Sequence, residues 1–255
     1  MSAVVEISVE GAVGYLTLDR PEAMNAVTIQ LGKELERAIL DTAPTVSVLV
    51  IRGAGGNFSV GGDFHELESL RARGVDAMAE LFDSFGRACA AIGVVDVPVI
   101  SAVEGYAMAG GFELMQASDI VLVSETARIA DTHLNHAQIP GGGSSQRLPR
   151  LVGRQRALSH ILTGDRLSGT DAVSWGLAYR AFPPAEFAAS VAAFAEKLAT
   201  KDRLALSTAK HLIYSSLELP LTEGLLAERA AVLAHLSADE ARSGLEAFTK
   251  GSTRA

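Results

Sequence analysis

The 255-residue chain has very little cysteine, with Cys89 as its single copy. One cysteine excludes a disulfide framework and any zinc or iron–sulfur site built from several cysteines. Basic residues are also in deficit, with 22 Lys and Arg against 30 Asp and Glu and a net charge of −8. This balance argues against a nucleic-acid binder, which normally carries an excess of basic residues.

Long hydrophobic runs are missing as well. No stretch approaches the ~18 uninterrupted apolar residues of a membrane span. The N-terminal segment MSAVVEISVEG contains acids and no basic region, so we expect no signal peptide and no membrane association. Apolar residues make up 48% of the chain, enough to bury a sizeable core. We therefore expect a globular cytoplasmic protein with one large domain, or one domain and a short extension.

Several sequence motifs of known chemistry are absent. The loop GAGGNF lacks the third glycine of a dinucleotide fingerprint, and neither GxxxxGK[ST] nor GxSxG occurs. Ser207 and Lys210 match SxxK, but within an ordinary amphipathic helical pattern. His133 and His136 form an HxxH pair without further ligands at matching spacing, so we expect no metal site.

The order of the predicted elements indicates the fold class. An N-terminal hairpin is followed by three short apolar runs that are typical of buried parallel strands: 46–51, 97–103 and 119–124. Helical patterns separate these runs, and from about residue 146 the chain is mostly helical, with four amphipathic segments at 185–199, 203–215, 222–235 and 238–248. This order favours an α/β domain followed by a C-terminal helical region.

Two junctions combine a buried strand, a glycine-rich loop and the start of a helix, at 46–63 and 97–114. Unpaired N–H groups at a helix start can bind an oxyanion or a phosphate, although such loops also occur as tight turns without a ligand. Glu113 stands three residues after Gly110, on the same helix face and one turn in. Its apolar neighbours suggest burial, and a buried carboxylate needs partners or a task. The alternative is a solvent-facing glutamate stabilised by the helix dipole.

In its sequence motifs the chain resembles the enoyl-CoA hydratase/isomerase (crotonase) superfamily over nearly its whole length. The resemblance is carried by five segments in order: LDRPEAMNAV, FSVGGDFHEL, PVISAVEGYAMAGGFELMQASDIVL, IPGGGSSQRLPRLVG and LTGDRLSGTDAVSWGLA. It implies an α/β spiral of repeated ββα units over 1–195, and a C-terminal helical region over 196–255 that forms a homotrimer or a dimer of trimers. It also implies an acyl-CoA thioester substrate and no cofactor, metal or redox group, because coenzyme A is part of the substrate.

The resemblance also implies roles for particular residues. The two amides of the oxyanion hole fall on Gly62 and Gly110, and the first catalytic glutamate falls on Glu113. Charge alone suggests Arg20 and Lys33 as partners of the CoA phosphates. The remaining substrate- and CoA-binding positions are Ala23, Asn25, Ala26, Gly61, Asp63, Phe64 and Gly111.

The chain departs from the family pattern at the second catalytic glutamate, where it has His133. A neutral imidazole can exchange a proton near pH 7, so Glu113 and His133 are predicted to form the acid/base pair of a hydratase-like lyase. The alternatives are a double-bond isomerase that needs Glu113 alone, a hydrolase or C–C-cleaving enzyme, and an acyl-CoA-binding paralogue with little turnover. The side chains of Asp131 and His136 are further candidates to point into the active site. The acyl group depends on pocket residues such as Phe64, Leu67, Phe82 and Phe85.

Overall fold

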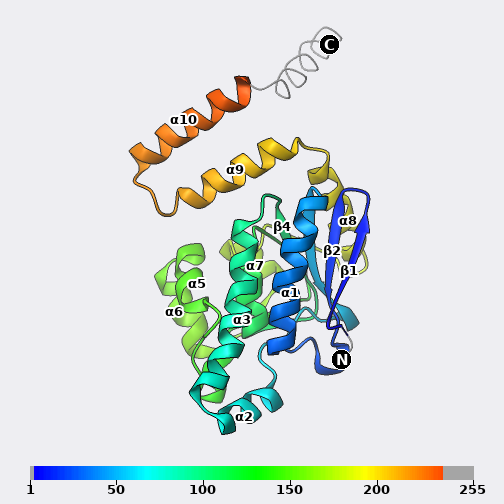
Figure 1. Ribbon diagram of the computed structural model, residues 1–255. Coiled ribbons are helices and arrows are strands. Elements are labelled where there is room, and N and C mark those ends of the chain that lie inside the picture. Colours follow the sequence, from blue (N-terminus) through cyan, green and yellow to red (C-terminus); the bar gives the residue numbers. More distant parts are fainter. Residues whose placement is uncertain (1–2, 238–255) are drawn as a thin grey trace. The chain divides into compact units, whose positions relative to one another are not determined.

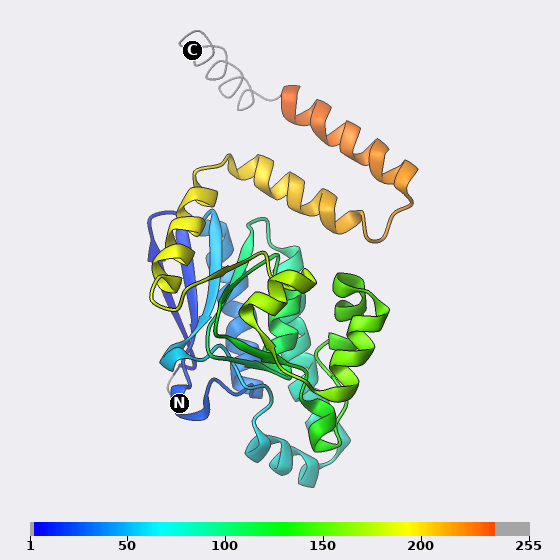
Figure 2. The same ribbon diagram turned by 180° about the vertical axis from the view of Figure 1, so that it is seen from behind.

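The computed structural model describes residues 3–237 (Figures 1 and 2). The chain forms two compact units, which divide between Thr200 and Lys201. The first unit contains both sheets and the helices up to α8. The second contains the last two described helices.

The main sheet of the first unit has six strands in the order β1-β2-β3-β4-β6-β9. Only the first pair is antiparallel, and every other neighbouring pair is parallel. The predicted hairpin and the three predicted buried strands are present, whereas the edge strand β9 was not predicted. The strands are β1 (Val5–Glu10), β2 (Val13–Leu18), β3 (Val48–Gly53), β4 (Val99–Val103), β6 (Ile120–Ser124) and β9 (Arg180–Phe182).

A second sheet has the order β5-β7-β8, with strands β5 (Tyr106–Met108), β7 (Arg128–Ala130) and β8 (Leu167–Ser168). Ser59 extends it through a parallel bridge to Ala107. Each of β4 and β6 is therefore followed by a short strand of the second sheet. The first pair leads into helix α4 (Gly110–Ala117) and the second into the short turn η4 (His133–His136) and then α5 (Ser144–Val152). This arrangement confirms the expected α/β fold of repeated ββα units.

Helices cover both faces of the main sheet (Figures 1 and 2). One face carries α1 (Ile29–Thr42), which packs against α3 (Val75–Val94), and the other face carries α8 (Phe187–Ala199). Helix α1 begins where the sequence predicts, because the Thr28 hydroxyl accepts a hydrogen bond from the Leu31 N–H at 3.1 Å. The other helices of this unit are α2 (Phe64–Arg73), α6 (Arg154–Thr163) and α7 (Gly169–Trp175).

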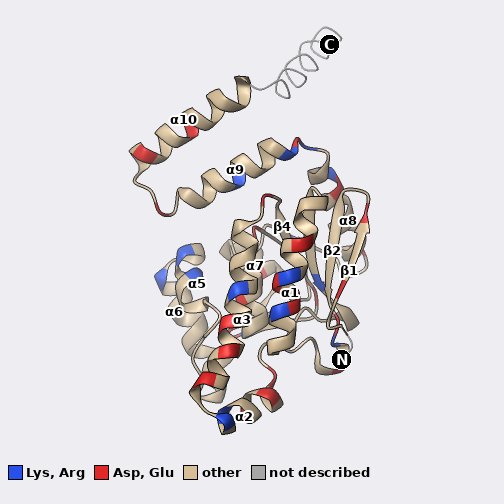
Figure 3. Cartoon of the chain, in the orientation of Figure 1, with Lys and Arg blue, Asp and Glu red and all other residues tan. Residues whose placement is uncertain are grey.

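Charged side chains are intermixed along the outer helices α1 and α3, with both signs present (Figure 3). Two ion pairs join these helices, Lys33 with Glu80 at 2.5 Å and Arg87 with Glu36 at 3.0 Å. Exposed pairs of this kind contribute little to stability. Within residues 3–237 no helix is both long enough and apolar enough to cross a membrane.

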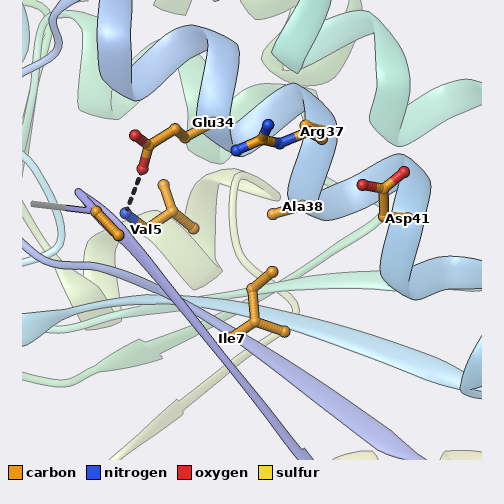
Figure 4. Close-up of a pocket in the computed structure, with 7 residues that line it drawn as sticks. Val5, Ile7, Glu34, Arg37, Ala38 and Asp41 are labelled. Carbon is orange, nitrogen blue, oxygen red and sulfur yellow. Dashed lines mark hydrogen bonds between the residues drawn. The ribbon is translucent and has the colours of Figure 1, made fainter. Parts of the chain in front are cut away.

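A groove of about 430 Å³ lies between β1 and α1 (Figure 4). Glu34 of α1 accepts hydrogen bonds there from the N–H groups of Val4, at 2.8 Å, and Val5, at 3.2 Å. These bonds fasten the first strand to the helix. None of the predicted site residues lines this groove.

The second unit contains α9 (Arg203–Ser215) and α10 (Leu221–Ser237), which pack on each other. Asp202 caps α9 by accepting a hydrogen bond from the Ala205 N–H at 2.7 Å. Leu225, Leu226 and Leu236 of α10 are each more than half exposed. The helix expected at 238–248 lies outside the described residues, and the trimer expected from this region stays a prediction.

Candidate active site

The first glycine junction follows β3 and ends at the start of α2. Val27 runs beside it and forms a parallel bridge to Gly62. The Val27 N–H donates to the Gly61 carbonyl at 2.7 Å, and the Asp63 N–H donates to the Val27 carbonyl at 2.9 Å. This pairing turns the Gly62 N–H away from Val27, and it donates to no group among residues 3–237.

The second junction lies between β5 and α4. Ala109 precedes the helix with a φ of +45° and a ψ of −115°, and Gly110 is the first helical residue. The Gly110 N–H likewise has no acceptor within the described part of the chain, as is usual in a first helical turn. A methyl group on Gly61 would lie 2.8 Å from the Gly110 nitrogen. The fold therefore brings the two predicted oxyanion junctions into direct contact.

Gly111 also allows the start of α4 to approach the first junction closely, at Ser59. A methyl group there would collide with the Ser59 carbonyl oxygen. Because that oxygen belongs to the backbone, it cannot move aside as a flexible side chain would. Gly111 thus acts by letting α4 pack onto the segment that carries Gly61 and Gly62.

The positive φ of Ala109 leads to a prediction about stability. A non-glycine residue in a rarely populated backbone region costs about 1–3 kcal/mol. Replacing it with glycine removes that cost but adds about 0.5–1 kcal/mol of backbone entropy to the unfolded chain. We expect Ala109→Gly to raise the free energy of unfolding by about 1 kcal/mol, measured by urea denaturation, and to leave turnover intact because the Gly110 N–H is unchanged. A fall in stability would show that Ala109 is not strained.

Glu113 is buried in the first turn of α4, with 2% of its surface exposed. Its Oε1 accepts hydrogen bonds from two backbone N–H groups, Gly142 at 2.7 Å and Ser144 at 3.0 Å. Its Oε2 faces His133, 3.8 Å from Nε2. Burial raises the pKa of Glu113 above its usual range, although the two N–H donors and His133 act in the opposite direction. Hydrogen bonds thus fix Oε1 of the carboxylate, whereas Oε2 accepts none of them and faces His133.

His133 follows β7 at the start of η4 and points its ring between two carboxylates. Its Nδ1 lies 2.7 Å from Oδ1 of Asp131, which also accepts the His133 N–H at 3.3 Å. Burial acts to lower the pKa of His133, but the hydrogen bond and charge of Asp131 and the charge of Glu113 outweigh it, so that pKa is raised. The pKa of Asp131 is lowered for the matching reason: burial opposes ionisation, and its bonds to His133 overcome that effect.

The structure separates the two other inward-turning candidates. Asp131 is completely buried beside His133. His136 is exposed and packs edge-on against Phe64, with 5.2 Å between ring centroids. Among residues 3–237 no group of three or more His, Cys, Asp or Glu side chains is placed to hold a metal ion.

The predicted CoA-binding loop is organised from within by Asn25. This residue is buried, has a φ of +57°, and accepts a hydrogen bond from the Arg20 N–H at 2.9 Å. Its amide donates to the carbonyls of Ala54, at 2.9 Å, and Asn57, at 2.7 Å. The side chain of Asn25 therefore holds the loop containing Ala23 and Ala26 against the loop after β3.

The two cations suggested for phosphate binding are both engaged elsewhere. Arg20 lies 2.9 Å from Asp63 and donates to the Ala26 carbonyl at 2.6 Å. Asp63 in turn caps α2, accepting bonds from the N–H groups of the next helical turn. Lys33 pairs with Glu80 on the outer helices. The guanidinium of Arg20 thus fastens the loop to α2. These contacts lend no support to phosphate binding by Arg20 or Lys33, which stays a prediction from charge alone.

Sequence reasoning did not find the residues that hold Glu113. The turn containing Gly142 was recognised only as glycine-rich, and nothing in the sequence linked it to Glu113. A methyl group on Gly142 would lie 2.6 Å from Glu113 Oε2 and 2.6 Å from the Phe85 ring. Arg147 donates to the Gly142 carbonyl at 2.6 Å and so fastens the turn whose Gly142 N–H binds Glu113. The only sequence signal available was a glycine run that opens a helix.

Two further pocket candidates also lie close to these turns. The Phe82 ring packs against Gly141, where a methyl group would come within 2.5 Å of it. Leu67 of α2 lies beside Gly62, 3.1 Å from the position of a methyl group there. Phe64, at the start of α2, is 55% exposed and lies at the surface with His136.

Comparison with known proteins defines the class. The model of the enoyl-CoA hydratase/isomerase family matches residues 8–253, and the chain belongs to this family of enzymes. It is 33% identical to a Rhizobium meliloti protein named "Probable enoyl-CoA hydratase", over 95% of this chain and 93% of that one. It is 32% identical to the mitochondrial enoyl-CoA hydratase of Pongo abelii, over 93% and 81% of the two chains.

Solved structures share the fold. A Thermobifida fusca protein described as an enoyl-CoA hydratase, in complex with CoA, superposes with a TM-score of 0.83 at 30% identity. The alignment covers 92% of this chain and 93% of that one. The backbone fold is therefore that of this family, whereas the roles of individual side chains must be argued from their own geometry.

Proposed function

We propose that this site adds water to the double bond of a 2-enoyl-CoA thioester. One observation carries the proposal: Glu113, on the helix start that presents the Gly110 N–H, faces His133 of η4 with 3.8 Å between Oε2 and Nε2. Two unsatisfied backbone N–H groups beside an acid/base pair match the needs of a reaction that passes through a thioester enolate. The solved relative with bound CoA, and another with acetoacetyl-CoA, support a CoA thioester as the substrate class.

In this scheme the N–H groups of Gly62 and Gly110 bind the thioester oxygen. Negative charge develops on that oxygen as water attacks the β-carbon, and preorganised donors stabilise it by a few kcal/mol each, roughly 2.7–4. Glu113 removes one proton from the attacking water, and the oxygen of that water bonds to the β-carbon. The π electrons shift toward the thioester oxygen. When the carbonyl re-forms, the α-carbon takes a proton from Nε2 of His133.

The remaining expectations from the sequence fit this scheme. The 23–26 loop is the proposed contact for the CoA moiety, and no step requires a metal or a redox cofactor. We also propose that the chain forms a homotrimer or a dimer of trimers through its C-terminal helices. The exposed leucines of α10 support that proposal, because large exposed apolar surfaces commonly mark interfaces.

A hydration assay with crotonyl-CoA tests the proposal by following the loss of the conjugated thioester absorbance. We expect the wild type to turn over and His133→Glu to be at least about tenfold slower, within the range for an impaired acid or base. A carboxylate at 133 would face both Asp131 and Glu113, and like charges at that distance oppose each other's ionisation. His65→Glu, on the exposed start of α2, is the matched control and should keep wild-type activity.

The opposite result would identify a different reaction. If the wild type is nearly inert and His133→Glu gains hydration, the native reaction is not hydration. Double-bond isomerisation and the cleavage of 3-oxoacyl thioesters would then be assayed with the same variants.

A further inference from the structure

We propose that Asp131 is a positioning residue that makes His133 the proton donor of this site and leaves Glu113 as the base. The inference rests on the proposed hydration and deepens it, because it assigns a direction to the acid/base pair. It begins with the contact between Oδ1 of Asp131 and Nδ1 of His133 at 2.7 Å.

The contacts of Asp131 fix the orientation of the imidazole ring. Oδ1 of Asp131 holds both the ring Nδ1 and the backbone N–H of His133. An ionised carboxylate only accepts hydrogen bonds, so Nδ1 must carry a proton. Nε2 is then the one ring nitrogen that can exchange a proton with a substrate, and it points toward Oε2 of Glu113.

Asp131 is itself held rigidly. It is completely buried after β7, and its backbone N–H donates to Nε2 of His160 at 3.3 Å. The His160 ring lies edge-on to Phe112 and to Trp175, with ring centroids 5.1 Å and 5.7 Å away. These contacts fix the backbone of Asp131, and burial confines its carboxylate beside the ring of His133.

The charges around His133 favour its protonated form. Glu113 faces it from α4 and Asp131 from the end of β7. His160 of α6 contacts the Asp131 backbone, and Arg147 of α5 contacts the turn at Gly142. Burial lowers the pKa of His160, which therefore stays neutral near pH 7. Arg147 is bonded to the Gly142 carbonyl. One imidazole thus lies between two carboxylates, and a proton on it reduces their repulsion.

The different surroundings of Glu113 and His133 make Glu113 the base and His133 the proton donor. Glu113 has one oxygen saturated by two N–H donors, which favours the anion, and its other oxygen is open to take a proton. His133 holds the proton to be given. After one turnover Glu113 carries a proton and His133 lacks one. The 3.8 Å between Oε2 and Nε2 is short enough for that proton to return through one bridging water, so the site resets with no net change.

The pH dependence of Asp131→Asn tests the inference. Protonated His133 is required, so wild-type activity should fall as the pH rises through the raised pKa of His133. Without the carboxylate that pKa falls, and the alkaline limb of kcat should move to lower pH by about one unit or more, the size typical of a nearby opposite charge. Near pH 6 the variant should stay within about threefold of the wild type, with KM unchanged, which a merely structural defect would not produce.

Asp165→Asn is the matched control, because it removes an exposed carboxylate that acts electrostatically on His160 rather than on His133. Its pH profile should overlay that of the wild type. Asp131→Asn could instead lower kcat equally at every pH, with the acid and alkaline limbs of the pH profile unshifted from those of the wild type. In that case Asp131 does not set the protonation of His133 and the inference is overturned.

A titration that needs no turnover separates this inference from the proposed function. Histidine labelled with ¹³C at Cε1 reports the pKa of each of the six histidines by NMR, and the signal lost in His133→Gln assigns residue 133. We expect the wild-type value to lie above 6.5 and to drop in Asp131→Asn. A wild-type value at or below 6.5 overturns the inference even if the variant does not fold. A raised value in an enzyme that fails to hydrate crotonyl-CoA would instead refute the proposed reaction alone.

Discussion

Glu113→Gln is expected to lower kcat for hydration by about 10³-fold, within the ~10²–10⁴ range of general-base catalysis. The amide has the shape of the carboxylate, and its oxygen can still accept the N–H groups of Gly142 and Ser144. It cannot take a proton from water. KM should change less than about threefold, because the lost interaction belongs to the transition state rather than to substrate binding. Steady-state hydration of crotonyl-CoA measures both constants.

The same variant separates an enzyme from a binding protein. Because the change removes a buried charge without leaving a cavity, we expect the melting temperature to stay within a few degrees or to rise. Glu68→Gln, an exposed acid on α2, is the control and should change neither constant. If Glu113→Gln keeps more than a tenth of wild-type turnover, Glu113 is not the base. If the wild type binds crotonyl-CoA but catalyses neither hydration nor the isomerisation and cleavage reactions named above, the chain is a binding paralogue.

Gly61→Ala is expected to lower kcat/KM by about 10²–10³-fold, the loss seen when one oxyanion donor is removed. Its methyl group would lie 2.7 Å from Cβ of Ala109 and 2.8 Å from the Gly110 nitrogen. These contacts must open by several tenths of an ångström. The shift would separate the segments that carry the Gly62 and Gly110 N–H groups, and hydrogen bonds weaken steeply with such misalignment.

The φ of +93° at Gly61 means that the alanine variant also has backbone strain. The control variant must therefore introduce such strain without a steric clash. Gly153→Ala does so, because Gly153 has a φ of +82° and open space around it. The ψ of +157° at Gly153 places its backbone in a region essentially restricted to glycine, where a side chain costs about 1–3 kcal/mol. The control should therefore lose that much stability, measured by urea denaturation, and keep its kcat/KM. Equal losses of activity in both variants would show that strain, and not the oxyanion geometry, explains the result.

The elements that the sequence predicted are those built from local signals. The hairpin β1–β2 is defined by its turn, and α1 by the Thr28 cap and a regular apolar spacing. The three buried strands appear as apolar runs long enough to recognise. Strands β5, β7 and β8 have only two or three residues each. A run that short has no measurable period, so only the pairing with neighbouring strands makes it a strand.

The sequence by itself determined the spacing of residues at the start of α4. Glu113 lies one turn after Gly110, because a helix fixes the relation between positions three residues apart. The oxyanion roles of Gly62 and Gly110 are implied by the resemblance to the family. The resemblance to the family rests on these same local patterns. The substitution of histidine at position 133 was also visible in the sequence.

Only the tertiary structure decided how these residues act together. The contact of Gly61 with Gly110 and the hydrogen bonds of Gly142 and Ser144 to Glu113 join segments far apart in the chain. The bond between His133 and Asp131 is local, but the approach of His133 to Glu113 is not. The tertiary structure also paired Arg20 with Asp63, which fastens the 20–26 loop to α2. Such contacts depend on how two sheets and their helices pack, and side-chain pairing across that packing leaves no periodic signal in the chain.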